Sequence, residues 1–232
     1  MSEVERYKRQ AAHAALARVR SGMRVGLGSG STAEHMVREL GRRLAAGELS
    51  DVRGVPTSRA IERLAQQVGV PLIELGAEGV DVAIDGMDEV DPALDAIKGL
   101  GGALTREKIV AAAAHEFVLI GDIGKKVGRL GERTPVPVEV LAFGWRRTLA
   151  HLRDLGADPH LRVHDGAPWG TDNGHLVVDC HLPAHLAADA LRAFAAAVDQ
   201  VPGVLGHGLF LGITARAYLA GPEGVEELLP PR

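Results

Sequence analysis

Short apolar stretches alternate with amphipathic, helix-like stretches through the first half of the chain, and this alternation restricts the fold most strongly. Residues 23–28 (MRVGLG) are followed by a helical pattern at 31–47, and the same order recurs over 52–69. Alternation of this kind predicts a parallel sheet with helices on both faces. Further apolar runs that suit buried parallel strands lie at 71–75, 80–85 and 117–122. Two more helices are expected, at 3–20 and 104–116.

The pattern changes near residue 132, where strand-like stretches come in a different order. Strands are expected at 134–141, 160–164, 175–182 and 204–213, with helices at 145–156 and 186–200. The order β-α-β-β-α-β is typical of a small ferredoxin-like domain. We therefore predict an α/β fold in two parts. Residues 1–131 and 208–232 would form a Rossmann-like domain, and residues 132–207 a smaller ferredoxin-like α+β domain, with 221–232 as a short tail containing at most one helical turn.

Composition excludes several classes of function. The formal net charge is −4, which provides no broad basic surface for nucleic acid. No apolar run approaches the ~18 residues that a membrane span requires, and the N-terminus lacks the apolar core of a secretory signal. The only cysteine is Cys180, so no intrachain disulfide can form and a reducing, cytoplasmic setting is expected.

The glycine-rich turn GLGSGSTA (26–33) joins the first expected strand to the next helix. Such a turn presents backbone N–H groups at the positive end of a helix, which suits a phosphate or carboxylate. Gly28 to Ala33 also fits the G-x-G-x-x-A dinucleotide fingerprint, but the second strand ends in VPTSRA without the acidic residue that would hold a ribose. A lone phosphate is thus favoured over a dinucleotide, and a structural tight turn capped by Ser31 or Thr32 remains the alternative.

Two further turns carry charged groups. Asp85 and Asp88 follow an apolar strand, where ligands of open α/β sheets bind. Their carboxylates suit sugar hydroxyls better than a metal, because no histidine lies nearby; turn capping is the structural alternative. Lys98 then precedes a glycine-rich loop and a helix whose first turn contains Glu107. Glu107 is either a general base or an ordinary dipole-stabilising residue, and the positive helix end would keep it ionised.

Lysine is rare in this chain, since 21 of the 26 basic residues are arginine. Lysine that persists in such a composition indicates positions that need a compact ammonium. The five lysines are Lys8, Lys98, Lys108, Lys125 and Lys126.

Four motifs, GLGSGSTA, DVAIDGMDEVD, KGLGGALTREK and GDIGKKV, resemble in order and spacing the type A ribose-5-phosphate isomerases. The resemblance runs from about Lys8 to the C-terminus. It implies an enzyme that interconverts ribose 5-phosphate and ribulose 5-phosphate in the pentose phosphate pathway, without metal or organic cofactor. It also implies a homodimer or homotetramer, with the small domain as a possible contact.

The resemblance assigns roles residue by residue. The implied catalytic residues are Glu107, Asp85, Lys98 and Asp88. The implied substrate-binding residues are Lys8, Ser29, Gly30, Ser31, Thr32, Asp85, Gly86, Met87, Asp88, Lys98, Gly99, Leu100, Gly101 and Lys125.

In the mechanism that this suggests, Glu107 moves the proton between C2 and C1. Lys98 and nearby amides stabilise the enediolate, while Ser31, Thr32, Lys8 and Lys125 hold the phosphate. Asp88 would orient the sugar or Lys98, and either Asp85 or Lys98 would open the sugar ring.

Three positions depart from the family pattern, namely Ser29, Met87 and Leu100, and none of them removes a titratable group. The alternatives are an amino-sugar phosphate deaminase or CoA transferase on a related scaffold, a sugar-phosphate sensor and a nicotinamide-dependent dehydrogenase.

Other conspicuous residues are assigned no site. The pairs His160/His164 and His181/His185 have helical metal-ligand spacing but overlap expected strands or turns, so no metal is expected. Trp145 and Trp169 are interpreted as packing or interface residues, and Cys180 as a buried thiol.

Overall fold

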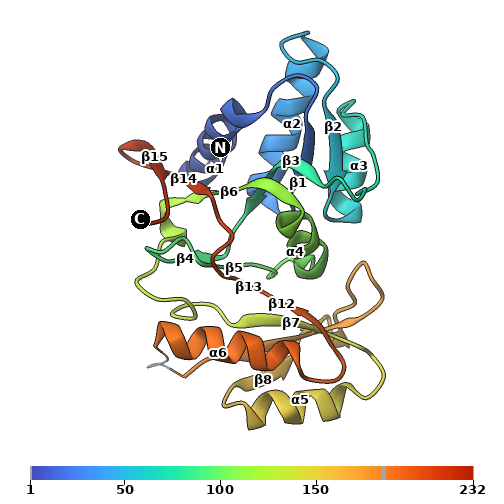
Figure 1. The fold of residues 1–232 in the computed structure, drawn as a ribbon, viewed down its shortest axis with the longest axis vertical. Helices are drawn as coiled ribbons and strands as arrows, with labels where there is room; N and C mark the ends of the chain where they lie inside the picture. The colour runs from blue at the N-terminus through green and yellow to red at the C-terminus, as the bar shows by residue number, and fades with distance from the viewer. Residues whose placement is uncertain (1, 184–186, 232) are drawn as a thin grey trace.

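A six-stranded sheet forms the upper half of the molecule in the computed structural model, which describes residues 2–183 and 187–231 (Figure 1). The strand order is β15-β14-β6-β3-β1-β2, and every neighbouring pair is parallel except the β14–β15 hairpin. The strands are β1 (Arg24–Leu27), β2 (Arg53–Pro56), β3 (Val80–Gly86), β6 (Ala114–Asp122), β14 (Arg216–Gly221) and β15 (Gly224–Leu228). The predicted parallel sheet is confirmed.

Helices cover both faces of this sheet because the strand residues alternate between two apolar cores. Ile84 and Val118 belong to the core shared with α1, α2 and α3, whereas Ala83 and Phe117 belong to the core shared with α4. The helices are α1 (Glu3–Ala15), α2 (Ser31–Ala45), α3 (Arg59–Gln67) and α4 (Leu104–Ala112). In the described residues, no helix is long and apolar enough to cross a membrane.

A second, four-stranded sheet lies below the first in Figure 1 and has the order β12-β7-β11-β8, with all pairs antiparallel. Counted along the chain this is the order fourth, first, third, second, with a helix after the first and third strands, as the β-α-β-β-α-β pattern predicts. The elements are β7 (Val136–Val140), α5 (Trp145–Asp154), β8 (Asp158–Leu161), β11 (Leu176–His181), α6 (Ala188–Asp199) and β12 (Val204–His207).

Smaller strands connect the two sheets. A three-stranded sheet, β13-β5-β4, lies between them in Figure 1, and a hairpin, β9–β10, precedes β11. The strands are β4 (Glu89–Val90), β5 (Ala96–Ile97), β9 (Val163–His164), β10 (Ala167–Pro168) and β13 (Leu209–Phe210).

Three sequence predictions are wrong at the level of single elements. Residues 71–75 form only one bridge, Gly54 to Leu72, and Pro71 has no N–H with which to extend the pairing. The C-terminal stretch is no helical tail but β15, because Gly224, with φ +110°, allows the tight turn back onto β14. The helix α4 ends at Ala112, since the chain pairs with β3 from Ala114 onward.

The parallel strands place five chain segments at one edge of the sheet, because each strand runs in the same direction and ends there. The closest approach is between the turn after β1 and the end of β3. A Cβ on Gly28 would lie 2.2 Å from an oxygen of Asp85, so only glycine fits at this position.

Candidate active site

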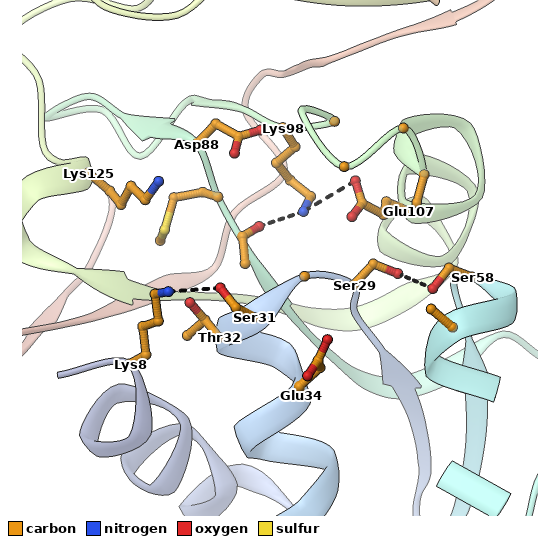
Figure 2. A pocket seen from close by; sticks show the side chains of 18 of the residues that line it. Lys8, Ser29, Ser31, Thr32, Glu34, Ser58, Asp88, Lys98, Glu107 and Lys125 are labelled. Carbon is orange, nitrogen blue, oxygen red and sulfur yellow. Dashed lines mark hydrogen bonds and ion pairs between the residues drawn. The ribbon is translucent and has the colours of Figure 1, made fainter. Parts of the chain in front are cut away.

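A cavity of about 690 Å³ opens at the carboxyl edge of the parallel sheet (Figure 2). It brings together most of the residues that the sequence singled out: Lys8, Ser29, Gly30, Ser31, Thr32, Gly86, Met87, Asp88, Lys98, Gly99, Gly101, Glu107 and Lys125 line it. Two implied substrate-binding residues do not line it. Asp85 is buried beneath the cavity, and Leu100 has its side chain 37% exposed at the surface.

The glycine turn shapes one end of the cavity. Gly30 has φ +92° and occupies the N-cap position of α2, which begins at Ser31. The expected side-chain cap by Ser31 or Thr32 is therefore wrong, and both hydroxyls are available to the cavity. The first N–H groups of α2 lie at the positive end of the helix, where an anion is stabilised.

Lys8 and Lys125 are the cations at this end. Lys8 extends from α1, where its ammonium lies 2.9 Å from the Ser31 hydroxyl and 2.7 Å from Glu5. Lys125 comes from the short 3₁₀ turn after β6, and Figure 2 shows it on the same side of the cavity as Lys8. Two ammonium groups beside a helix N-terminus, with the Ser31 and Thr32 hydroxyls, form a cradle suited to a phosphate.

The hydroxyl of Ser29 faces a second hydroxyl pair, which the sequence analysis did not select. It lies 2.8 Å from both the Thr57 and the Ser58 side-chain oxygens at the end of β2. Ser58 also caps α3 by accepting the N–H of Ile61. In the sequence, this hydroxyl pair is marked by the Thr-Ser step of VPTSRA, directly before a helix. The sequence analysis used that stretch only to show that the acidic residue of a dinucleotide site is missing.

Asp85 forms an ion pair with a deeply buried cation, Lys98. One of its oxygens accepts the N–H groups of Ser29 and Gly86 at 2.9 and 2.7 Å, and the other lies 3.0 Å from the Lys98 ammonium. Lys98 is only 2% exposed, and its ammonium also donates to the carbonyl of Gly86. The Phe210 ring lies 5.4 Å away. These contacts hold the ammonium in place, and Figure 2 shows it directed toward Glu107.

Glu107 faces the same ammonium from the first turn of α4. Its Oε2 lies 3.4 Å from the Lys98 nitrogen and finds no hydrogen-bond donor within the described part of the chain. The side chain is 5% exposed, so this oxygen is buried at the cavity wall with an ion pair to Lys98 but no hydrogen bond. An unsatisfied buried acceptor is costly, which indicates a group kept for a ligand rather than for stability.

Burial and the Asp85 charge raise the pKa of Glu107 to about 8, although Lys98 acts in the opposite direction. The expectation that the helix end keeps Glu107 ionised is therefore wrong, because burial outweighs the helix dipole. Burial alone would lower the pKa of Lys98, but the nearby carboxylates of Asp85 and Glu107 raise it. Two carboxylates thus share one ammonium, and a proton on Glu107 relieves the excess negative charge. A carboxyl with a pKa near neutrality can both accept and return a proton.

Asp88 lies at the upper wall and orients the loop that follows Lys98. One of its oxygens accepts the N–H of Leu100 at 2.9 Å. Leu100 therefore contributes to the site through its backbone, and its side chain, a departure from the family pattern, points away from the cavity.

The second sheet contributes a wall of the cavity that the sequence analysis did not foresee. The residues Trp169, Gly170, Thr171 and Asp172, between β10 and β11, line it. The interpretation of Trp169 as a packing or interface residue is therefore incomplete. The turn signal TDNG predicts a loop here. Because the loop is distant in sequence from the other motifs, the sequence did not indicate that it lies at the cavity.

The histidine pairs do not form a metal site in the described residues. No group of three or more potential histidine, cysteine or acidic ligands occurs there. His160 instead contacts Asp158 at 3.0 Å and the ring of His181, while His185 lies outside the described residues. Burial raises the pKa of Cys180 to about 12, which leaves it an unreactive thiol.

The raised pKa of Glu107 makes a stability prediction. A carboxyl whose folded pKa exceeds its unfolded value stabilises the fold below the unfolded pKa, and this contribution disappears as pH rises through about 8. We expect Glu107→Gln to have nearly the wild-type melting temperature at pH 5 and a melting temperature several degrees above wild type at pH 9.

Differential scanning calorimetry from pH 5 to 9 measures this difference. The exposed Glu223→Gln serves as the control and is expected to differ from wild type by the same amount at every pH. A difference for Glu107→Gln that did not grow with pH would contradict the raised pKa.

Comparison with known proteins agrees with this geometry. Residues 53–224 match the family model described as ribose 5-phosphate isomerase A (phosphoriboisomerase A). The ribose-5-phosphate isomerase A of Roseiflexus castenholzii is 51% identical over 224 residues, which cover 96% of this chain and 94% of that protein.

Two solved structures share the whole fold. One is ribose 5-phosphate isomerase A from Methanocaldococcus jannaschii, with a TM-score of 0.91 and 38% identity over 97% of this chain and 99% of that one. The other is a D-ribose-5-phosphate isomerase in complex with phospho-erythronic acid, with a TM-score of 0.93 and 38% identity over 98% of this chain and all of that one.

Proposed function

Because this chain belongs to the ribose 5-phosphate isomerase A family, we propose that its cavity holds ribose 5-phosphate with the reacting carbons at Glu107. The chain is an aldose–ketose isomerase of the pentose phosphate pathway, which interconverts ribose 5-phosphate and ribulose 5-phosphate. The similar proteins are ribose-5-phosphate isomerases, so the alternative functions of a deaminase, a CoA transferase or a sensor are not favoured. One observation carries the assignment of the residues: the Lys98 ammonium lies between the Asp85 and Glu107 carboxylates, and one Glu107 oxygen is left without a hydrogen bond.

The phosphate is proposed to bind at the end of the cavity formed by Lys8, Lys125 and the start of α2. The Ser31 and Thr32 hydroxyls and the first amides of the helix supply neutral donors, and the two ammonium groups supply charge. A relative of similar structure was solved in complex with phospho-erythronic acid, which shares a phosphate group with ribose 5-phosphate. Binding at this remote end positions the reacting carbons without contributing directly to bond breaking.

The chemical step moves one proton between neighbouring carbons. Glu107, in its ionised form, removes the proton from C2 of the open-chain aldose, and the electron pair of the C–H bond moves toward the carbonyl to form an enediolate. O1 gains a proton and the C2 hydroxyl loses one, and the same carboxyl then returns the carbon-bound proton to C1, which gives the ketose with its carbonyl at C2. A positioned carboxylate base is typically worth roughly 10²–10⁴-fold in rate.

Lys98 is proposed to stabilise the oxygen that becomes negative. Its ammonium is buried, and its contacts with Asp85 and Gly86 hold it in place, so no reorganisation is needed as the charge develops. Both Asp85 oxygens are already engaged, and the residue does not line the cavity. We therefore assign proton transfer to the sugar oxygens during ring opening to Lys98, with Asp85 acting through it. Asp88 would orient a sugar hydroxyl.

Replacement of the base tests the assignment directly. We expect Glu107→Gln to lower kcat by roughly 10²–10⁴-fold, because the amide cannot accept the proton. Binding of ribitol 5-phosphate, a non-reacting analogue, is expected to stay close to wild type, because the phosphate cradle is unchanged. A coupled assay and isothermal titration calorimetry measure the two quantities, with Glu223→Gln as the control. Wild-type turnover by Glu107→Gln would remove Glu107 from the mechanism.

The pH dependence tests the electrostatic argument. The free enzyme must have Glu107 ionised, so kcat/KM is expected to rise with pH and level off above about 8. Asp85→Asn removes the negative charge that raises this pKa, and its normalised profile is expected to level off at a lower pH than wild type. Initial rates from pH 6 to 10 measure both profiles. An unchanged midpoint in Asp85→Asn would contradict the shared-ammonium account.

The organisation and assembly of the chain are also part of the proposal. We assign residues 1–131 with 208–232 to a catalytic domain and residues 132–207 to a smaller domain. In support of this, most of one apolar core lies beneath β7, β11, α5 and α6, although Ile97 and Leu209 also pack in it. A homodimer or homotetramer that contacts through the smaller domain would cover Phe143, which is 92% exposed, and its neighbour Leu141, 38% exposed.

Light scattering tests this contact. The chain has a mass of 24.4 kDa, and we expect the measured mass of the wild type to be two or four times this value. Phe143→Ser is expected to lower the measured mass, because it removes the most exposed apolar side chain of the proposed contact. Ile109→Ser, on the exposed side of α4, is the matched control. Dissociation by Ile109→Ser alone would place the contact elsewhere.

A further inference from the structure

The loop between β10 and β11 reaches from the second sheet to the active-site cavity. Its residues Trp169 to Asp172 line the cavity, although they lie more than 60 positions after Glu107 in the chain. The mechanism above assigns these residues no role.

Hydrogen bonds hold this loop against the helices of the first sheet. The Asp172 carboxylate accepts the N–H of Arg59, at the start of α3, at 2.7 Å. The Arg106 guanidinium of α4 donates to the side-chain oxygen of Asn173 at 2.7 Å. Arg106 directly precedes Glu107, so the loop is fixed to the helix that carries the proposed base.

The other side of the loop is anchored in the second sheet. The Thr171 hydroxyl donates to Glu139 at 2.6 Å, and the side-chain amide of Asn173 donates to the same carboxylate at 3.1 Å. Glu139 is fully buried in β7. A segment with anchors on both sheets has few alternative positions and acts as a rigid wall.

The indole of Trp169 is seated against the loop that follows Lys98. A Cβ built on Gly102 would lie 2.8 Å from the indole nitrogen, so the ring occupies the space that any larger residue there would need. The Arg162 guanidinium lies 6.0 Å from the indole centroid and donates to the carbonyls of Gly99 and Leu100 at 3.1 and 2.8 Å. The ring and the cationic loop are therefore held together.

The wall closes the end of the cavity opposite the phosphate cradle. Figure 2 shows Lys8 and Lys125 on one side of the cavity and Glu107 and Ser58 on the other. Asp172 binds the backbone of the residue that follows Ser58, so the loop lies on the Glu107 side. A sugar whose phosphate is held at the lysines and whose reacting carbons reach Glu107 would direct its C1 end toward this loop.

We propose that Trp169 is a specificity-determining residue that limits the length of the sugar phosphate to five carbons by closing the cavity beyond C1. The proposal rests on the proposed function, because it uses the direction in which ribose 5-phosphate lies. The indole is held against Gly102 and lines the cavity, so a sixth carbon beyond C1 is expected to meet the ring. One extra methylene in a hydrophobic pocket is typically discriminated by about 10-fold or more, which sets the scale of the effect expected against the indole.

A pair of alditol phosphates measures this limit. Ribitol 5-phosphate and glucitol 6-phosphate have no carbonyl and do not react, and their uncharged ends remove any effect of the Asp172 carboxylate. Each is tested as a competitive inhibitor of ribose 5-phosphate isomerisation. We expect the wild type to bind the five-carbon compound at least about 10-fold more tightly than the six-carbon one.

Variants then test the indole itself. Trp169→Ala is expected to lower the ratio of the two inhibition constants by about 10-fold, chiefly through tighter binding of glucitol 6-phosphate, whereas Trp169→Phe keeps a flat ring and most of the discrimination. Trp145→Phe, the same kind of change outside the cavity, is the matched control and is expected to leave the ratio at the wild-type value.

Three results would overturn the inference. These are an unchanged ratio in Trp169→Ala, an equal weakening of both inhibitors, which indicates a merely structural role, and an equal effect of Trp145→Phe. The proposed function fails separately, if the wild type does not isomerise ribose 5-phosphate at all.

Discussion

The buried ammonium of Lys98, shared by two carboxylates, is the interaction on which the site depends. A cation that is 2% exposed is stable only with anionic partners, and Asp85 and Glu107 supply two negative charges for its one positive charge. Burial, together with this excess negative charge, raises the pKa of Glu107 to about 8. The buried carboxylate lowers the stability of the fold at high pH, but it also gives a carboxyl that can take up and release a proton near neutral pH.

The fold creates this arrangement through the direction of its strands. β1, β2, β3 and β6 run parallel, so the turns that follow them meet at one edge although they are distant in sequence. The absence of a side chain on Gly28 lets the first turn approach Asp85 closely enough for the Ser29 N–H to bind its carboxylate. Asp85 is thus oriented by backbone groups, and it in turn orients Lys98.

The second sheet completes the cavity rather than merely adjoining it. Arg162 and Trp169 contact the loop after Lys98, and Asp172 caps α3, so both sheets determine where the loop amides lie. The residues proposed to act on the substrate lie on segments of the first sheet, whereas residues from both sheets shape the cavity. We therefore expect a change in the β10–β11 loop to alter which sugar phosphate fits without contacting the proposed catalytic residues.

The sequence alone determined the element types and the chemical residues. Apolar runs and helical spacing predicted the parallel sheet and the β-α-β-β-α-β order, and rare lysines together with family motifs identified Glu107 and Lys98. These signals are local, or are carried by short motifs. Only the tertiary structure decided that Asp85 lies buried beneath the cavity, that the stretch after Gly221 pairs as a strand, and that Trp169 lines the cavity. Such features depend on contacts between segments far apart in the chain, and neither periodicity nor composition records them.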